Sequence, residues 1–259
     1  MTSFGKLFKV TINEKFKAMN FILLIDLIAI AVTSIWVAIT GTLNSAVFSS
    51  IVFSWSSIVY LVAFIRLSVL QEKTFTRDSY RLIPIGDIKF YLSNLASTVV
   101  SFLYVFVVQV VLYGIVVAMN WHDVKDIMTY MKLMNPGTEF SAMNITLAGL
   151  SVVMLTLAMT VLGWTTINLI HLVGRAAGNF LPSTGRKALN VVMYILVIWL
   201  VLRVVSFLNT QIGNSMSLIS NSNDTLTFFL NVAAFLVVAA VEAAVSIYLL
   251  NRWVETITE

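Results

Sequence analysis

Three ionisable side chains interrupt long apolar runs, and they are the residues of this sequence best placed to do chemistry. Asp26 lies about six residues, roughly 9 Å, inside the first run. Glu242 lies about eight residues, roughly 12 Å, from the inner end of the last run, and Arg203 lies toward the outer end of the fifth. Inside a bilayer each charge is costly unless it is paired or hydrated. Either the three residues line a translocation cavity, or they bond to neighbouring helices while Arg203 reaches the headgroups.

Other chemistry is not supported by the motifs. Residues 174–187 (GRAAGNFLPSTGRK) superficially suggest a phosphate-binding loop, but six residues separate Gly178 from Gly185. Arg186 also stands where that motif requires lysine. The chain has no cysteine, and its two histidines are far apart, so neither a thiolate site nor a zinc site is expected. We therefore expect no catalytic residue, metal or cofactor in this chain.

The composition predicts a membrane protein. Hydrophobic residues make up 59% of the 259 residues and charged residues only 11%, with a mean hydropathy of +0.93. Soluble domains carry about 25% charged residues, so this chain could not cover a surface that faces water. The net charge of +4 resides mainly in the connections between apolar runs, which does not indicate nucleic-acid binding. We predict one all-α integral membrane domain over residues 1–259, with the lipid bilayer as its solvent.

Six apolar runs come near the ~20 residues that a membrane-spanning helix needs. The fourth is too long for one straight crossing, so it tilts, kinks near Gly163 or extends into the cytoplasm. The predicted spans are Phe21–Thr40, Ser45–Leu67, Leu95–Met119, Met143–Val173, Leu189–Leu208 and Leu226–Leu250.

The basic residues predict the orientation. Lys125 and Lys132 are the only two that fall on one side of the six spans, and Arg203 lies within a span. All the others of the 16 lie in the amino-terminal segment, the polar stretch Arg66–Asn94, residues 174–188 or the tail 251–259. Basic loops stay inside, so both termini are predicted to be cytoplasmic, in a multi-pass protein of a cell membrane, by preference a bacterial plasma membrane. Residues 209–225 form either a re-entrant element or a flexible loop.

The segment before the first span has a helical pattern of its own. Phe4, Phe8, Ile12 and Phe16 recur every fourth residue of Thr2–Asn20, with lysines on the other faces. This spacing is typical of an amphipathic helix that lies in the membrane interface. The alternative is a basic flank that only sets the orientation.

The longest polar interruption, Arg66–Asn94, separates the second and third spans. Its residues 68–94 are predicted to be a structured cytoplasmic loop, with a short helix over Glu72–Tyr80 followed by Pro84 and a glycine. Such a mixed-charge loop between two spans is a docking surface for a soluble partner. The residues best placed to meet that partner are Glu72, Arg77, Asp78 and Arg81.

The order of elements resembles the membrane subunit, or permease, of type-two ABC exporters. The closest local similarity runs through Glu72–Thr74, Tyr80–Leu82, Pro84–Ile85 and Ile88–Lys89. It is similar to that family's acidic residue, leucine-rich turn, proline and lysine opening the third span, although the chain lacks the glycine expected after Lys73. The resemblance implies that this loop is a coupling helix that sits in a cleft of an ATPase.

The resemblance also implies partners and substrates. A second permease, identical or similar, and two ABC ATPase subunits would complete the transporter, and ATP and Mg²⁺ would bind in those subunits. Substrates in the family are drugs, lipids, polysaccharides or antimicrobial peptides. The alternative that the residues themselves leave open is a stand-alone immunity or ion-coupled transport protein, with Asp26 and Glu242 as proton sites. An intramembrane enzyme is disfavoured because no nucleophile and base pair up.

Overall fold

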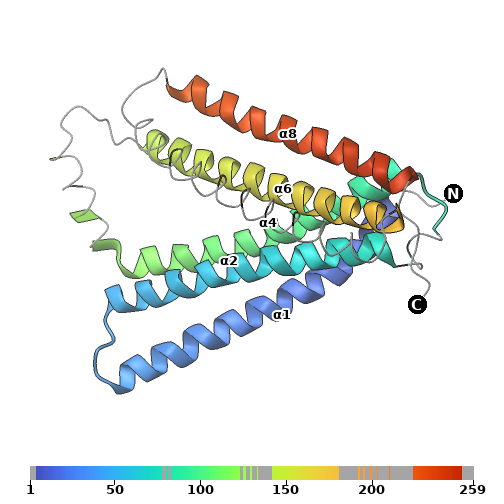
Figure 1. Cartoon of the computed structure of the whole chain (residues 1–259). Helices are drawn as coiled ribbons and strands as arrows, with labels where there is room; N and C mark the ends of the chain where they lie inside the picture. The colour runs from blue at the N-terminus through green and yellow to red at the C-terminus, as the bar shows by residue number, and fades with distance from the viewer. Residues whose placement is uncertain are drawn as a thin grey trace. The chain divides into compact units, whose positions relative to one another are not determined.

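The chain folds into long helices (Figure 1). The computed structural model describes residues 4–77, 80, 83–122, 125–126, 129, 133, 142–180, 192, 195, 199, 203, 210 and 224–252. Among these residues no strand occurs. The five long helices of this described part are α1 (Phe4–Ile39), α2 (Ser45–Thr76), α4 (Asp87–Met119), α6 (Ala142–Phe180) and α8 (Asp224–Arg252). Each contains a stretch long and apolar enough to cross a membrane, as in a multi-pass membrane protein.

These helices coincide with five of the six predicted spans. The start of α2 at Ser45 and the end of α4 at Met119 agree with the prediction to the residue. The predicted fifth span, Leu189–Leu208, lies largely outside the described residues, so the count of six stays a prediction. Its described residues are all helical: Val192, Ile195, Trp199 and Arg203.

The helices on both sides of the long polar stretch are longer than the apolar runs. The second helix was expected to end at Leu67 and continues to Thr76, and α4 begins at Asp87 instead of Leu95. Residues Glu72–Thr76 therefore belong to α2, which corrects the prediction that a separate short helix begins at Glu72, while Tyr80, at the other end of that prediction, is helical. The reason is packing: the buried stripe of α2 continues past the apolar run through Leu70, Gln71, Thr74 and Phe75.

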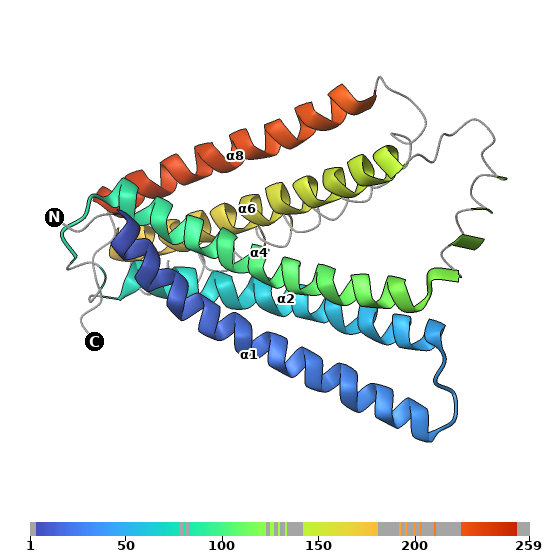
Figure 2. The same ribbon diagram turned by 180° about the vertical axis from the view of Figure 1, so that it is seen from behind.

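The chain divides into two compact units, the first built from α1, α2 and α4 and the second from α6 and α8. In the first unit each helix packs against the other two. Figure 2 shows that α1 and α4 run in the same direction and α2 runs opposite to both. We call the end with residues 77–86 the loop end and the end with residues 40–44 the turn end.

The turn between α1 and α2 is closed by local hydrogen bonds. Gly41 has φ 73°, a conformation that glycine adopts at no steric cost. The side chain of Asn44 then accepts from the backbone N–H of Val47 at 2.8 Å, which caps α2. A turn this short makes α1 and α2 antiparallel neighbours, as expected for two consecutive spans.

Apolar contacts close the first unit at both ends. Toward the turn end, the packed cluster consists of Ile30, Ile51, Val52 and Val116. Toward the loop end, Phe75 stacks on Tyr91 at 5.3 Å between ring centroids and meets the edge of Phe90 at 5.8 Å. Many large apolar side chains face outward, among them Trp36 with 69% exposed, which is the pattern expected where lipid is the solvent.

In the described part of the second unit, the two long helices α6 and α8 pack against each other. α6 has 39 residues, about 58 Å at 1.5 Å each, and passes through Gly163 as one helix. It therefore extends beyond the expected span Met143–Val173 at both ends. The core between the two helices consists of Leu155, Ala158, Met159, Phe228 and Val232, with Phe235 packed against it.

Candidate functional site

A single stripe of α1 faces the first unit, and it carries two ionisable groups. The buried residues recur every three or four positions, which is the helical period. They are Leu7, Thr11, Lys15, Met19, Leu23, Asp26 and Ile30. The amino-terminal segment is thus continuous with the first span and packs along its own buried line.

The predicted aromatic stripe lies one position away from this line. Phe4 is exposed, and Phe8, Ile12 and Phe16 are half-buried. Phe4 stacks on Phe8, and Phe16 packs against Tyr104 of α4 at 5.1 Å between ring centroids. These residues flank the buried line, so their membrane-facing role stays a prediction.

The ammonium of Lys15 is buried between α1 and α4, with 1% of the residue exposed. Its Nζ donates at 2.7 Å to the backbone oxygen of Asn94, the Oδ1 of Asn94, the Oγ of Ser97 and the Oγ1 of Thr98. We call the group formed by Lys15, Asn94, Ser97 and Thr98 the lysine clamp. From the sequence, Lys15 was one of the basic residues that predict the orientation in the membrane. Its burial could not be predicted, because it depends on the register between α1 and α4.

The hydroxyl groups of the clamp are oriented by the same carbonyl. Ser97 and Thr98 each donate to the backbone oxygen of Asn94, at 2.8 and 2.9 Å. Their protons are therefore committed, and their lone pairs face Nζ. All four contacts of Lys15 are acceptors, which matches an ammonium with three protons to share. Asn94 in turn donates from Nδ2 to the backbone oxygen of Gln71 at 2.9 Å, so the clamp also reaches α2.

The residue next to Lys15 connects α1 to the loop. Glu14 accepts from the phenol of Tyr80 at 3.0 Å and forms an ion pair with Arg77 at 3.4 Å. Arg77 and Glu14 are 47% and 38% exposed, so the pair is worth little in stability and serves to place the loop. Burial, and then the hydrogen bond and charge of Glu14, raise the pKa of Tyr80, so its phenol remains a donor.

The other predicted loop residues are placed only in part. Glu72 is half-buried on the last turns of α2, and Arg77 is the exposed residue that ends this helix. Pro84 is exposed just before α4. Asp78 and Arg81 lie outside the described residues. Their role as partner contacts stays a prediction.

Asp26 lies at the centre of a hydrogen-bonded chain that joins three helices. Gln109 of α4 donates from Nε2 to the Oδ2 of Asp26 at 2.7 Å. Ser56 of α2 donates to the Oε1 of Gln109, also at 2.7 Å. All three residues are buried. The Oδ1 of Asp26 is buried and has no hydrogen-bond partner within the described part of the chain.

Glu242 is held in the second unit by two threonines of α6. Thr165 donates to its Oε2 at 2.8 Å, and Thr166 lies 2.8 and 3.0 Å from its two carboxylate oxygens. The same two hydroxyls also lie within 2.9 Å of the backbone oxygen of Leu162. The carboxylate is thus hydrogen-bonded between two neighbouring helices while it remains half-buried.

Arg203, the third predicted cavity residue, has a different environment. Its guanidinium lies over the ring of Trp199, 5.5 Å from the centroid. Within the described residues, each of the three predicted cavity residues therefore has its own set of partners. A shared cavity lined by Asp26, Glu242 and Arg203 stays a prediction.

Comparison with known proteins adds no identification. No protein-family model, curated protein or solved structure matches this chain. The function must therefore be argued from the geometry of the described helices.

Proposed function

We propose that this chain is the permease subunit of an ATP-driven ABC exporter. The observation that supports it is the connection between the 77–86 loop and α1. Arg77 and Tyr80 contact Glu14, and the neighbouring Lys15 is clamped to α4. A soluble subunit that binds the loop therefore acts on two helices of the first unit, which is the mechanical requirement for coupling.

In the proposed mechanism, two ATPase subunits bind the loops of two permeases, which are identical or similar. ATP and Mg²⁺ bind in the ATPases, whose closure presses on the loop and tilts the helices. The pathway alternates between inward-open and outward-open states because ATP binds these states with different affinity. The loop end faces the cytoplasm, and the substrate is a drug, a lipid or an antimicrobial peptide.

The test is a charge swap in the loop that leaves the net charge unchanged. Glu72→Arg with Arg81→Glu should reduce co-purification of a P-loop ATPase with the tagged chain by about tenfold or more, equal to ~1.4 kcal/mol. Complementary charges set encounter and register at such surfaces. The same charge swap should also abolish substrate-stimulated ATP hydrolysis in reconstituted membranes, while the amount of inserted protein stays constant.

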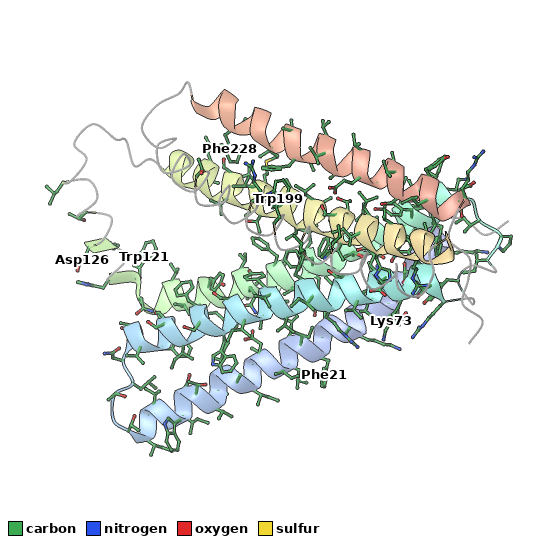
Figure 3. The ribbon with its side chains drawn as sticks, in the orientation of Figure 1. Phe21, Lys73, Trp121, Asp126, Trp199 and Phe228 are labelled. Carbon is green, nitrogen blue, oxygen red and sulfur yellow. The ribbon has the colours of Figure 1, made fainter. Side chains whose placement is uncertain are left out.

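The matched control lies at the opposite end of the same unit. Lys125 and Asp126 are exposed, and Figure 3 shows Lys73 near the loop end and Asp126 at the other. The swap Lys125→Asp with Asp126→Lys should leave ATPase binding unchanged. Failure of any ATPase to co-purify with the wild-type chain, or equal binding by both swapped variants, would contradict the proposal.

The second candidate is a stand-alone immunity or ion-coupled transport protein. It is favoured by the two carboxyl groups, Asp26 and Glu242, that are hydrogen-bonded between helices. Transport by the purified chain in vesicles, driven by a proton gradient without any ATPase, would support this candidate over the first.

A further inference from the structure

The carboxyl group of Asp26 is satisfied on one side only. Its Oδ2 accepts from Gln109, whereas its Oδ1 is buried with no donor among the described residues. A carboxylate has two charged oxygens that both need donors, but a carboxylic acid has one acceptor oxygen and one hydroxyl. The one observed donor satisfies the acceptor oxygen of the acid, and a proton on Oδ1 removes the negative charge that a carboxylate would leave on a buried oxygen without a donor.

The orientation of Gln109 makes this asymmetry a fixed feature. Ser56 donates to the Oε1 of Gln109, and this turns the Nε2 toward Asp26. Gln109 therefore presents a donor to Oδ2. The serine hydroxyl, on α2, thus favours the orientation of the Gln109 amide in which it donates to Asp26.

No positive charge is placed to neutralise an ionised Asp26 in the described first unit. The nearest cation on the same face of α1 is Lys15, 11 residues away, or about 16 Å along the helix. On the packed helices, the titratable groups near this region are Tyr60 of α2 and Tyr113 of α4, and neither carries a positive charge. A buried charge without a paired counter-charge is strongly disfavoured.

We infer that Asp26 is a proton-binding site, with the proton on Oδ1 and with Gln109 and Ser56 holding the carboxyl in place. Binding adds one O–H bond and removes one negative charge from the interior of the first unit. Release transfers this proton from Oδ1 to a water molecule and restores the negative charge, so it requires a movement that separates α1 from α4 far enough for water to reach Oδ1. This inference does not depend on an ATPase partner, and it assigns the bound ion and the oxygen that carries it.

Infrared spectroscopy of the full-length chain in lipid bilayers tests this directly. A protonated carboxyl group has a C=O band distinct from that of a carboxylate, and it shifts on deuterium exchange. At neutral pH the wild type should show one such acid band from a side chain, and Asp26→Asn should lack it. The matched control is Asp126→Asn, because Asp126 is 68% exposed, and that variant should keep the band.

Two further measurements remain informative if Asp26→Asn fails to fold. In the wild type alone, the acid band should persist as the pH rises past the range in which exposed carboxyl groups ionise. Ser56→Ala should shift the band, because Gln109 then loses the contact that orients its amide. A wild-type spectrum at neutral pH with only carboxylate bands, or an acid band that Asp26→Asn and Ser56→Ala both leave unchanged, would overturn the inference.

Discussion

The lysine clamp gives a prediction whose size can be worked out from its contacts. Lys15→Met removes the ammonium and keeps most of its volume. The backbone oxygen of Asn94 still accepts from Ser97 and Thr98, and both hydroxyls keep that bond, so of the four contacts only the Oδ1 of Asn94 is left with no hydrogen bond. One buried acceptor left without a donor costs about 1–3 kcal/mol. No uncompensated charge remains, so the cost stays below the 3–5 kcal/mol typical when one partner of a buried ion pair is removed.

The opposite change should cost more. Ser97→Ala with Thr98→Val removes two acceptors and leaves a buried ammonium that must share its three protons between the two oxygens of Asn94. Each hydrogen bond lost by a charged group is worth about 1.5–3 kcal/mol. Adding Lys15→Met to that double variant should then be neutral or stabilising. The coupling between the two sides of the clamp should reach 0.5–3 kcal/mol, as for residues in one network.

The assay is reversible unfolding of the purified chain in mixed micelles, with a midpoint measured for each variant. Lys17→Met is the matched control, since Lys17 is exposed on the same helix and its removal should change stability by no more than about 0.5 kcal/mol. An equal destabilisation by Lys15→Met in the wild-type and in the hydroxyl-free background would refute the clamp. A loss no larger than that of Lys17→Met would refute the burial of Lys15.

Two further predictions concern topology and transport. A reporter fused after Glu259 and one placed near Gly137 should report opposite sides of the membrane, and cytoplasmic signals from both would contradict six spans with both termini inside. Asp26→Asn and Glu242→Gln should reduce transport in vesicles more than they reduce the amount of inserted protein, because they change polarity and hardly alter volume. Thr166→Val, which keeps the volume of the side chain, is the comparison for Glu242→Gln, because it removes a hydrogen-bond partner of Glu242 and leaves the carboxyl group in place. Normal transport by both acid variants would assign Asp26 and Glu242 a structural role only.

Hydropathy located the helices better than it located their ends. The apolar run of the second span stops at Leu67, but α2 continues to Thr76 because Thr74 is still buried and Phe75 packs against Phe90 of α4. Hydropathy reports which residues prefer lipid, whereas a helix ends where its backbone hydrogen bonds end, here at Arg77. The same difference explains why the amino-terminal helix is continuous with the first span.

In each candidate site the charged residue could be predicted from the sequence, but its hydrogen-bond partner could not. Asp26 and Glu242 could be recognised because a carboxyl group in an apolar run is rare. Their partners Gln109 and Thr165 could not, because a polar uncharged residue in a span has no distinctive pattern. Which one faces a carboxyl group depends on the register between two helices, and no single-sequence periodicity contains that information.

The two polar contacts of α1 constrain how the first unit can move. Lys15 and Asp26 are 11 residues apart, about three helical turns, so both lie on the face toward α4. Their partners Asn94 and Gln109 follow in the same order along α4, which runs parallel to α1. Rotation of α1 or sliding along α4 would break both contacts together.

Glu14 lies about 100° around the helix from Lys15, and the same rotation of α1 would break its hydrogen bond with Tyr80. A force applied to the loop therefore cannot rotate α1 without breaking these hydrogen bonds. A rigid tilt of the three helices together keeps all of them, and it is the kind of motion by which domains close and open.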